Sequence, residues 1–288
     1  MSHWLPLLGM LAACGGSTSS SQTGATAAAA DSVVPAAMVT VDHARSRPMS
    51  DGASAALARL RGTDATGAPV RYRVERGAVV GGGQLVGQVT QRTAVAGDSA
   101  IVPSHDVGVC HPFTDSWLPS RDGGVGNAVV WLVGVTHGPP PEAPRRAFLT
   151  LDGCQLTPRV VMVAAGGTLL VTSRDAMTSR LRFTQADGAD SARATVSFTD
   201  AGQVVPTSTV ATTPGILEVR DDWHPWVRGA VVVVPHPFVM VTAPTGAFAF
   251  DGVPPGRYTL LTWHERLGVR TVPVVITGGV ETRVNVAY

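Results

Sequence analysis

The sequence predicts an all-β protein built of two β-sandwiches. From Gly81 to the C-terminus, runs of alternating apolar and polar residues, rich in β-branched side chains, are bounded by Gly, Pro, Asp and Asn. This is the pattern of short strands joined by turns. The 288 residues include 32 glycines and 21 prolines, and such a content of turn formers favours strands over helices. A chain of this length suits two domains of ordinary size better than one core.

Residues 31 to 75 are mostly small or polar, and Ala53 to Arg61 is their one stretch with the composition of a short helix. We expect the rest of this region to be a linker or a docked arm. After it, strands and turns are expected to alternate to the end of the chain. The predicted strands are residues 84–90, 128–135, 147–151, 160–164, 168–173, 180–184, 192–198, 215–220, 229–234, 238–242, 247–250, 256–263, 271–277 and 281–287.

Charge and motifs exclude several classes of function. The 22 basic residues, all of them arginines, nearly balance 21 acidic residues, so no strongly basic surface is expected to attract nucleic acid. Without lysine the chain has neither a Schiff-base residue nor a P-loop lysine. The GxSxG, HExxH and glycine-rich phosphate motifs are missing as well. We therefore predict no enzyme, no catalytic residue and no cofactor.

The start of the chain has the features of an export signal. Residues 1–13, MSHWLPLLGMLAA, are apolar but shorter than the roughly 20 residues of a membrane-spanning helix, which suits a signal peptide. The run LAACG, from Leu11 to Gly15, resembles the lipobox of bacterial lipoproteins. That resemblance implies a lipid anchor on Cys14, with a membrane as partner and the cell envelope as location. Gly15 in place of aspartate favours the outer membrane, facing the periplasm or the cell surface, and residues 14–75 would be a flexible tether.

The number of cysteines agrees with the prediction of export. With Cys14 lipidated, Cys110 and Cys154 are left as an even pair in a compartment that permits disulfides. We expect them to be bonded, which would stabilise the fold by about 4 kcal/mol in the chain-entropy model. The alternative is two reduced cysteines. Neither has a CxxC neighbour, so a zinc-ribbon or thioredoxin-like site is not expected.

The C-terminal part carries a specific pattern. The runs VTAPTGAFAF (residues 241–250) and VPPGRYTL (residues 253–260) resemble the carboxypeptidase regulatory-like domain, a transthyretin-like sandwich. Gly246 would supply a tight turn, and Phe248 and Phe250 would point to one face. Because the upstream runs LVGQV and AVVWL match two further strands of such a domain, we expect it to combine residues 76–147 with residues 236–288.

Residues 148–235 are similar to a cupredoxin, a Greek-key sandwich. The resemblance is carried by CQLTP from Cys154, by TSRD from Thr172, where the family has an Asn-x-Asp turn, and by VRDDWHPWVRG from Val219. This domain would be inserted into, or packed on, the transthyretin-like sandwich. The combination resembles the proteins labelled methylamine-utilization-like.

The resemblance to cupredoxins does not extend to their copper ligands. A type 1 copper centre needs a thiolate, two imidazoles and usually a weak thioether. Here Asp221 stands in place of the thiolate and Val227 in place of the thioether, while Ser179 lies near the position of the first histidine. Of the four ligands only His224 remains, so we expect no type 1 copper.

A different metal site is the alternative at this place. His224 could combine with Asp221 or Asp222, or with His236, His264 and Glu265 if the two sandwiches bring them together, to hold an ion such as zinc. The competing interpretation is that these histidines are packed and hydrogen-bonded. Adjacent carboxylates such as Asp221 and Asp222 point to opposite faces of a strand, so they are not expected to form an acid/base pair.

The functional prediction is a non-enzymatic, lipid-anchored envelope protein that serves as a binding or structural module. Its partner could be an envelope protein or, by analogy of fold, a glycan that stacks on an exposed tryptophan. The alternative is a metal-binding protein without type 1 copper, or a vestigial electron-transfer accessory that uses His224. A hydrolase with an unrecognised site is a third hypothesis. The candidate stacking residues are Trp117, Trp131, Trp223, Trp226 and Trp263.

Overall fold

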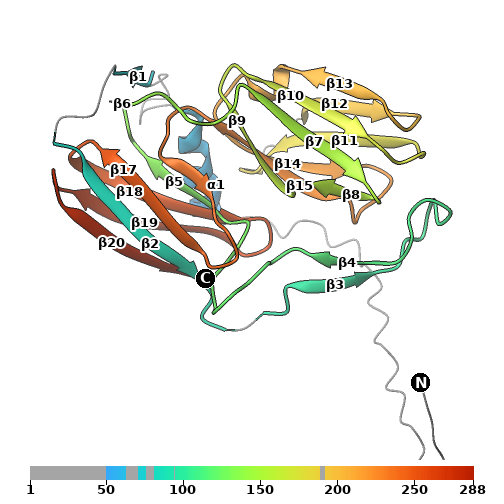
Figure 1. Ribbon diagram of the computed structural model, residues 1–288, viewed down its shortest axis with the longest axis horizontal. Helices are drawn as coiled ribbons and strands as arrows, with labels where there is room; N and C mark the ends of the chain where they lie inside the picture. Colours follow the sequence, from blue (N-terminus) through green and yellow to red (C-terminus); the bar gives the residue numbers. More distant parts are fainter. Residues whose placement is uncertain (1–49, 63–70, 76–80, 94, 189–191) are drawn as a thin grey trace, which may run out of the picture. The chain divides into compact units, whose positions relative to one another are not determined.

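The computed structural model describes residues 50–62, 71–75, 81–93, 95–188 and 192–288 (Figure 1). The predicted signal peptide, Cys14 and the first part of the predicted tether lie outside these residues. Within them, the chain forms β-strands, one α-helix and two short 3₁₀ helices, so the all-β prediction is confirmed. No helix in this described part is long and apolar enough to cross a membrane.

The first sandwich consists of two mixed sheets, with strand orders β13–β10–β7–β8 and β12–β11–β14–β15–β9. The pairs β7–β10 and β9–β15 are parallel and the other pairs antiparallel. Alternate side chains of both sheets, among them Leu149, Leu181 and Phe183, fill a shared apolar core. The strands are β7 (Arg146–Asp152), β8 (Gln155–Thr157), β9 (Val160–Ala164), β10 (Thr168–Ser173), β11 (Ser179–Gln185), β12 (Ala192–Phe198), β13 (Val204–Thr207), β14 (Gly215–Asp221) and β15 (Arg228–Val234).

The second sandwich combines strands that precede and follow the first in the chain. Its sheets have the orders β16–β5–β18–β19 and β17–β2–β20. Leu85, Leu132, Phe248 and Phe250 lie in its core, the two phenylalanines on one face as expected. The strands are β2 (Gly83–Thr90), β5 (Val129–Val133), β16 (Val239–Val241), β17 (Ala247–Val253), β18 (Gly256–His264), β19 (Gly268–Ile276) and β20 (Glu281–Ala287).

A third apolar cluster joins the two sandwiches. Val232 on the outer face of β15 packs in it with Trp131 and Trp263 of the second sandwich. Helix α1 (Asp51–Ala58), capped by the Ser50 hydroxyl at 3.3 Å from the Ala53 N–H, continues into η1 (Arg59–Arg61) and adds buried leucines to the same cluster. These residues lie in the stretch predicted to be a tether, but they are folded and packed, as the docked-arm alternative expected.

A two-stranded ribbon that the sequence pattern did not predict runs between the cores. Strand β3 (Asp98–Ile101) pairs antiparallel with β4 (Phe113–Ser116). Ile101 belongs to the core of the first sandwich, whereas Trp117, just after β4, belongs to that of the second. A disulfide joins Cys110, in the ribbon loop, to Cys154, between β7 and β8, so the predicted pair is bonded. The strands β1 (Arg73–Val74) and β6 (His137–Gly138) pair in parallel over two residues.

The turn before β17 requires glycine. Gly246 has φ +71° and a Cβ built on it would collide with the Val89 carbonyl oxygen. The approach is close because the Gly246 carbonyl accepts a hydrogen bond from the Val89 N–H at 2.8 Å. Gly279 has almost the same φ, +69°, but nothing lies within 4 Å of its Cβ position.

We therefore predict that Gly246→Ala costs more stability than Gly279→Ala. A left-handed conformation costs an L-residue about 1–2 kcal/mol, and both variants carry that term. Gly246→Ala adds the collision with the backbone, so we expect its free energy of unfolding to fall by at least about 2 kcal/mol more. Urea unfolding of both variants measures the difference, and equal losses would contradict the close approach.

Candidate functional site

The turn that joins β14 to β15 positions His224. Asp221, the last residue of β14, accepts hydrogen bonds at Oδ1 from the backbone N–H groups of Trp223 and His224, at 2.8 and 2.9 Å. The N–H of Val227 then donates to the His224 carbonyl at 2.8 Å. An aspartate that bonds the backbone two and three residues later is a common way to begin such a turn. The chain therefore turns back toward the sandwich and buries the imidazole.

Both ring nitrogens of His224 face carboxylates. Nδ1 lies 2.9 Å from Asp221 Oδ1 and Nε2 lies 2.8 Å from Asp106 Oδ2, and the His224 side chain is only 1% exposed. Trp226 packs edge-on against the ring. With a proton on each nitrogen, the imidazole donates to both carboxylates at once. The arrangement thus favours a charged His224.

Burial and hydrogen bonding shift the pKa values of His224 and Asp221 in opposite directions. Burial by itself lowers the pKa of His224, but hydrogen bonds and charge from Asp221 and Asp106 outweigh it, so that pKa is raised above 6.5. Burial raises the pKa of the Asp221 carboxyl, but hydrogen bonds from His224, Ser179 and the backbone outweigh it, so that pKa is lowered. Each of the two groups therefore favours the ionised form of the other.

Every acceptor site of Asp221 is occupied. Its Oδ2 accepts a short hydrogen bond from the Ser179 hydroxyl and another from the Arg180 N–H at 2.8 Å. Its Oδ1 takes the Nδ1 and the two backbone donors described above. Ser179 thus serves as a donor to the Asp221 carboxylate. We call Asp106, Ser179, Asp221 and His224 the His224 cluster.

Asp106 reaches His224 from the ribbon. It lies in the loop between β3 and β4 with φ +48°, and its carbonyl accepts from the N–H groups of Val109 and Cys110 at 2.8 and 2.7 Å. The disulfide from Cys110 to Cys154 fixes the same loop to the first sandwich, and Met177 packs on both sulfurs. The disulfide and the Asp106 carboxylate therefore both hold the ribbon loop against the first sandwich.

The other two candidate histidines, His236 and His264, contact residues outside the His224 cluster. His236 packs against Tyr72, Trp131 and Phe238, and burial lowers its pKa to about 4. His264 packs against Trp117, and burial, followed by the charge of Arg159, lowers its pKa to about 4. Among the described residues, no group of three or more His, Cys, Asp or Glu side chains is placed to hold a metal ion.

Four of the five candidate stacking residues are buried. Trp117, Trp131, Trp226 and Trp263 are at most 7% exposed, whereas Trp223, in the β14–β15 turn, is 45% exposed. Of these five, only Trp223 offers an accessible ring.

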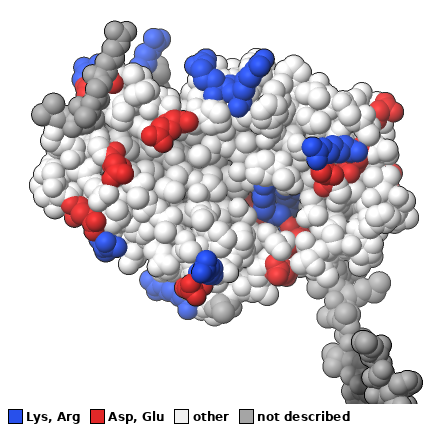
Figure 2. Space-filling view, viewed as in Figure 1, with Lys and Arg blue, Asp and Glu red and all other residues white. Residues whose placement is uncertain are grey.

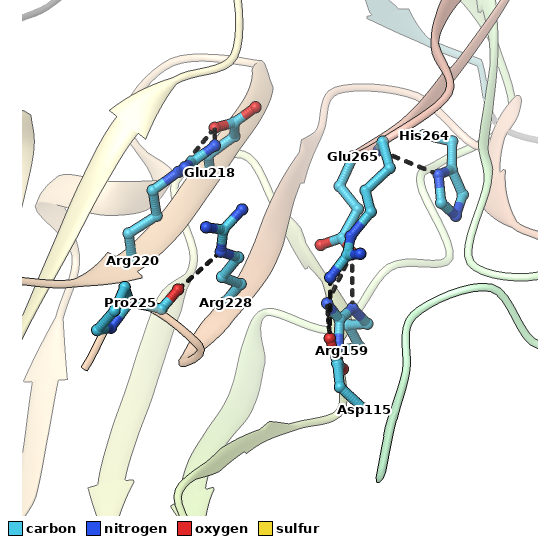
Figure 3. A network of polar contacts seen from close by, with 9 residues as sticks. Asp115, Arg159, Glu218, Arg220, Pro225, Arg228, His264 and Glu265 are labelled. Atoms are coloured by element: carbon cyan, nitrogen blue, oxygen red, sulfur yellow. Dashed lines mark hydrogen bonds and ion pairs between the residues drawn. The ribbon is translucent and has the colours of Figure 1, made fainter. Parts of the chain in front are cut away.

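A second polar cluster lies where the sandwiches meet. Arg159, between β8 and β9, forms ion pairs with Asp115 of β4 and, at 2.7 Å, with Glu265 of the β18–β19 turn (Figure 3). Arg266 pairs with Asp115 at 3.1 Å. Figure 2 shows basic and acidic side chains next to one another near the centre of this face. One guanidinium thus connects the first sandwich, the ribbon and the second sandwich.

Sequence reasoning singled out His224, Asp221 and Glu265 but missed Asp106, Ser179 as a donor, Asp115 and Arg159. Asp106 is 118 positions from His224, and no periodic pattern links residues at that separation. Its proximity to Cys110 was the one available signal, since the expected disulfide brings that loop toward Cys154.

Comparison with known proteins gives a fold-level similarity. No protein-family model matches the chain, and no curated protein matches it significantly. Matching solved structures include a mutant of amicyanin in the reduced Cu(I) form at pH 4, with 20% identity over 32% of this chain and 83% of that chain and a TM-score of 0.27. Another is amicyanin from Paracoccus versutus (Thiobacillus versutus), with 18% identity over 33% of this chain and 84% of that chain and a TM-score of 0.27. Each match concerns a cupredoxin-like domain of about a third of this chain.

We predict a pH signature for His224. Because its pKa is raised, its stabilising contribution is complete below about pH 6.5 and is lost as the pH rises through the raised pKa. His224→Gln should therefore lower the free energy of unfolding by about 3 kcal/mol at pH 5 to 6, and by less at higher pH. His236 and His264 titrate alike in both proteins and cancel in the difference.

Denaturant unfolding of both proteins between pH 5 and pH 9 measures this difference. The exposed His111 provides the control, since His111→Gln should change stability by no more than about 0.5 kcal/mol at any pH. A wild-type advantage that stays constant or grows above pH 7 would show that His224 is neutral in the fold.

Proposed function

We propose that this chain is a non-enzymatic binding or structural module of the bacterial cell envelope, with a cupredoxin-like sandwich whose former copper end is a hydrogen-bonded polar cluster. The observation that supports this role best is the engagement of His224. Both of its ring nitrogens are within 2.9 Å of a carboxylate oxygen. The proposal takes its envelope location from the lipobox-like run around Cys14.

The chemistry of the cluster favours a structural role over metal binding. A metal takes a neutral imidazole with a free lone pair, and binding must displace the proton. Here the two carboxylates stabilise that proton. The Asp221 oxygens accept five hydrogen bonds, and Asp222 is paired with Arg182 at 2.9 Å. An ion would have to break these contacts to find ligands.

Electron transfer needs a redox centre, and the residue types at this end do not supply a type 1 copper site. The second hypothesis is an electron-transfer accessory protein that binds a metal in another type of site. It predicts that the purified chain contains metal, whereas our proposal predicts that it does not. Glycan binding is a weaker extension of the binding role, resting on the single ring of Trp223.

The metal test uses the full chain purified after growth with copper or with zinc. We expect less than about 0.1 metal ion per chain, because proton and carboxylates occupy the nitrogens that an ion would need. Asp106→Ala frees Nε2 and is the sensitive variant; His111→Ala is its control. Stoichiometric metal in the wild type that disappears in His224→Ala would overturn the proposal in favour of the metal-binding hypothesis.

The anchor test is independent of the fold. Cells that produce the chain in the presence of radioactive palmitate should label it, because an acylated cysteine carries the fatty chains. Cys14→Ser should abolish the label and release the protein from the membrane fraction, whereas Ser17→Ala should change neither. An unlabelled wild-type chain would remove the lipid anchor from the proposal.

A further inference from the structure

Three arginines stand directly opposite one another on neighbouring strands of the first sandwich. The register pairs Arg182 of β11 with Arg220 of β14, and Arg220 with Arg228 of β15. Like charges in direct register destabilise a sheet. This arginine row therefore needs negative charge nearby, and the row is the starting point of the inference.

The members of the row differ in what neutralises them. Arg182 donates to Asp222 at 2.9 Å, and Arg220 donates to Glu218 through Nε and a terminal nitrogen at 3.2 and 2.8 Å. Arg228 donates its Nε to the Pro225 carbonyl at 2.8 Å and forms no ion pair within the described part of the chain. In Figure 3 no dashed line reaches the terminal nitrogens of Arg228.

Arg228 lines a pocket between the sandwiches. The cavity volume of the pocket is about 20 Å³, which is room for little more than one water-sized group. Its two carboxylates are already engaged, Glu218 with Arg220 and Glu265 with Arg159. We call it the seam pocket; its lining residues are Glu218, Val219, Arg220, Arg228, Gly229, Glu265 and Arg266.

The electrostatics of the pocket agree with this geometry. Burial, and then the positive charges of Arg220 and Arg266, lower the pKa of Arg228. Glu265 and Glu218 act in the opposite direction on that pKa, but both carboxylates are already paired with other arginines. A guanidinium whose two terminal nitrogens are free presents the planar fork that fits a carboxylate.

The geometry points to a carboxylate-binding site in the seam pocket, in which the free edge of Arg228 holds a small carboxylate anion and Arg220 and Arg266 flank it. The cavity volume of about 20 Å³ admits the carboxylate end of the anion, so the rest of the ligand would lie outside the pocket. This inference deepens the binding role proposed above and rests on it. Its test is separate, because metal uptake at His224 would overturn that role without changing the response to carboxylates.

The test measures thermal unfolding of the full chain in acetate and in succinate, with chloride at matched ionic strength as the reference. We expect saturating acetate or succinate to raise Tm by about 2–4 °C, because a ligand bound to the folded state alone stabilises it. Arg228→Met should lose the shift and Arg228→Lys most of it, since an ammonium cannot form the fork. Arg283→Met, at an arginine paired with Glu281 on β20, should keep it.

Two further arms make the result decisive. In chloride, Arg228→Met should unfold at the wild-type Tm or above it, because the variant removes a like-charge pair from the row. If its Tm is lower than that of the wild type, Glu218→Gln becomes the deciding variant. That variant removes negative charge from the pocket, so it should bind acetate several-fold more tightly. The carboxylate site would be overturned if acetate and succinate raised Tm no more than chloride does. It would also be overturned if Glu218→Gln bound acetate no more tightly than the wild type, or if sulfate and phosphate raised Tm equally.

Discussion

Burying a charged imidazole between two carboxylates is favourable only when every donor and acceptor keeps a partner, because an unpaired charge away from water costs several kcal/mol. That constraint organises the end of the first sandwich. Asp221 satisfies the turn and one ring nitrogen, but Nε2 needs a partner from another segment. The β3–β4 ribbon supplies Asp106, and the disulfide holds the loop in place. The ribbon is therefore part of the His224 cluster, although it lies far from it in the chain.

At the junction of the sandwiches, apolar burial and ion pairs lie side by side. Its centre is apolar, with Trp131 and Trp263 against the outer face of β15, and this burial supplies the attraction. Polar groups gather beside it, where Arg159 bridges Asp115 and Glu265. Arg228 is the one guanidinium lining the seam pocket that no carboxylate neutralises. The first sandwich thus has a fully hydrogen-bonded cluster at one end, whereas its junction with the second sandwich has a guanidinium without an ion pair.

Sequence periodicity predicted most strands because one face of each is buried. The predicted strand ends lie within about three residues of those in the structure. The strands that were missed, such as β3, β8 and β13, have three or four residues, too few for alternation to show. The turn at Gly246 and the face shared by Phe248 and Phe250 could be inferred because both depend on local geometry.

Contacts between distant segments could not be inferred in the same way. His224 stood out as the surviving residue of a recognisable motif, yet its second carboxylate comes from a loop whose position depends on the packing of two sandwiches. The arginine row depends on register, and a shift of one residue would turn Arg220 to the opposite face. The composition gives the number of charged residues but does not predict which of them form ion pairs. For that reason the sequence pattern supports an all-β protein, whereas the two carboxylate partners of His224 and the Arg228 guanidinium without an ion pair emerge only from the three-dimensional arrangement.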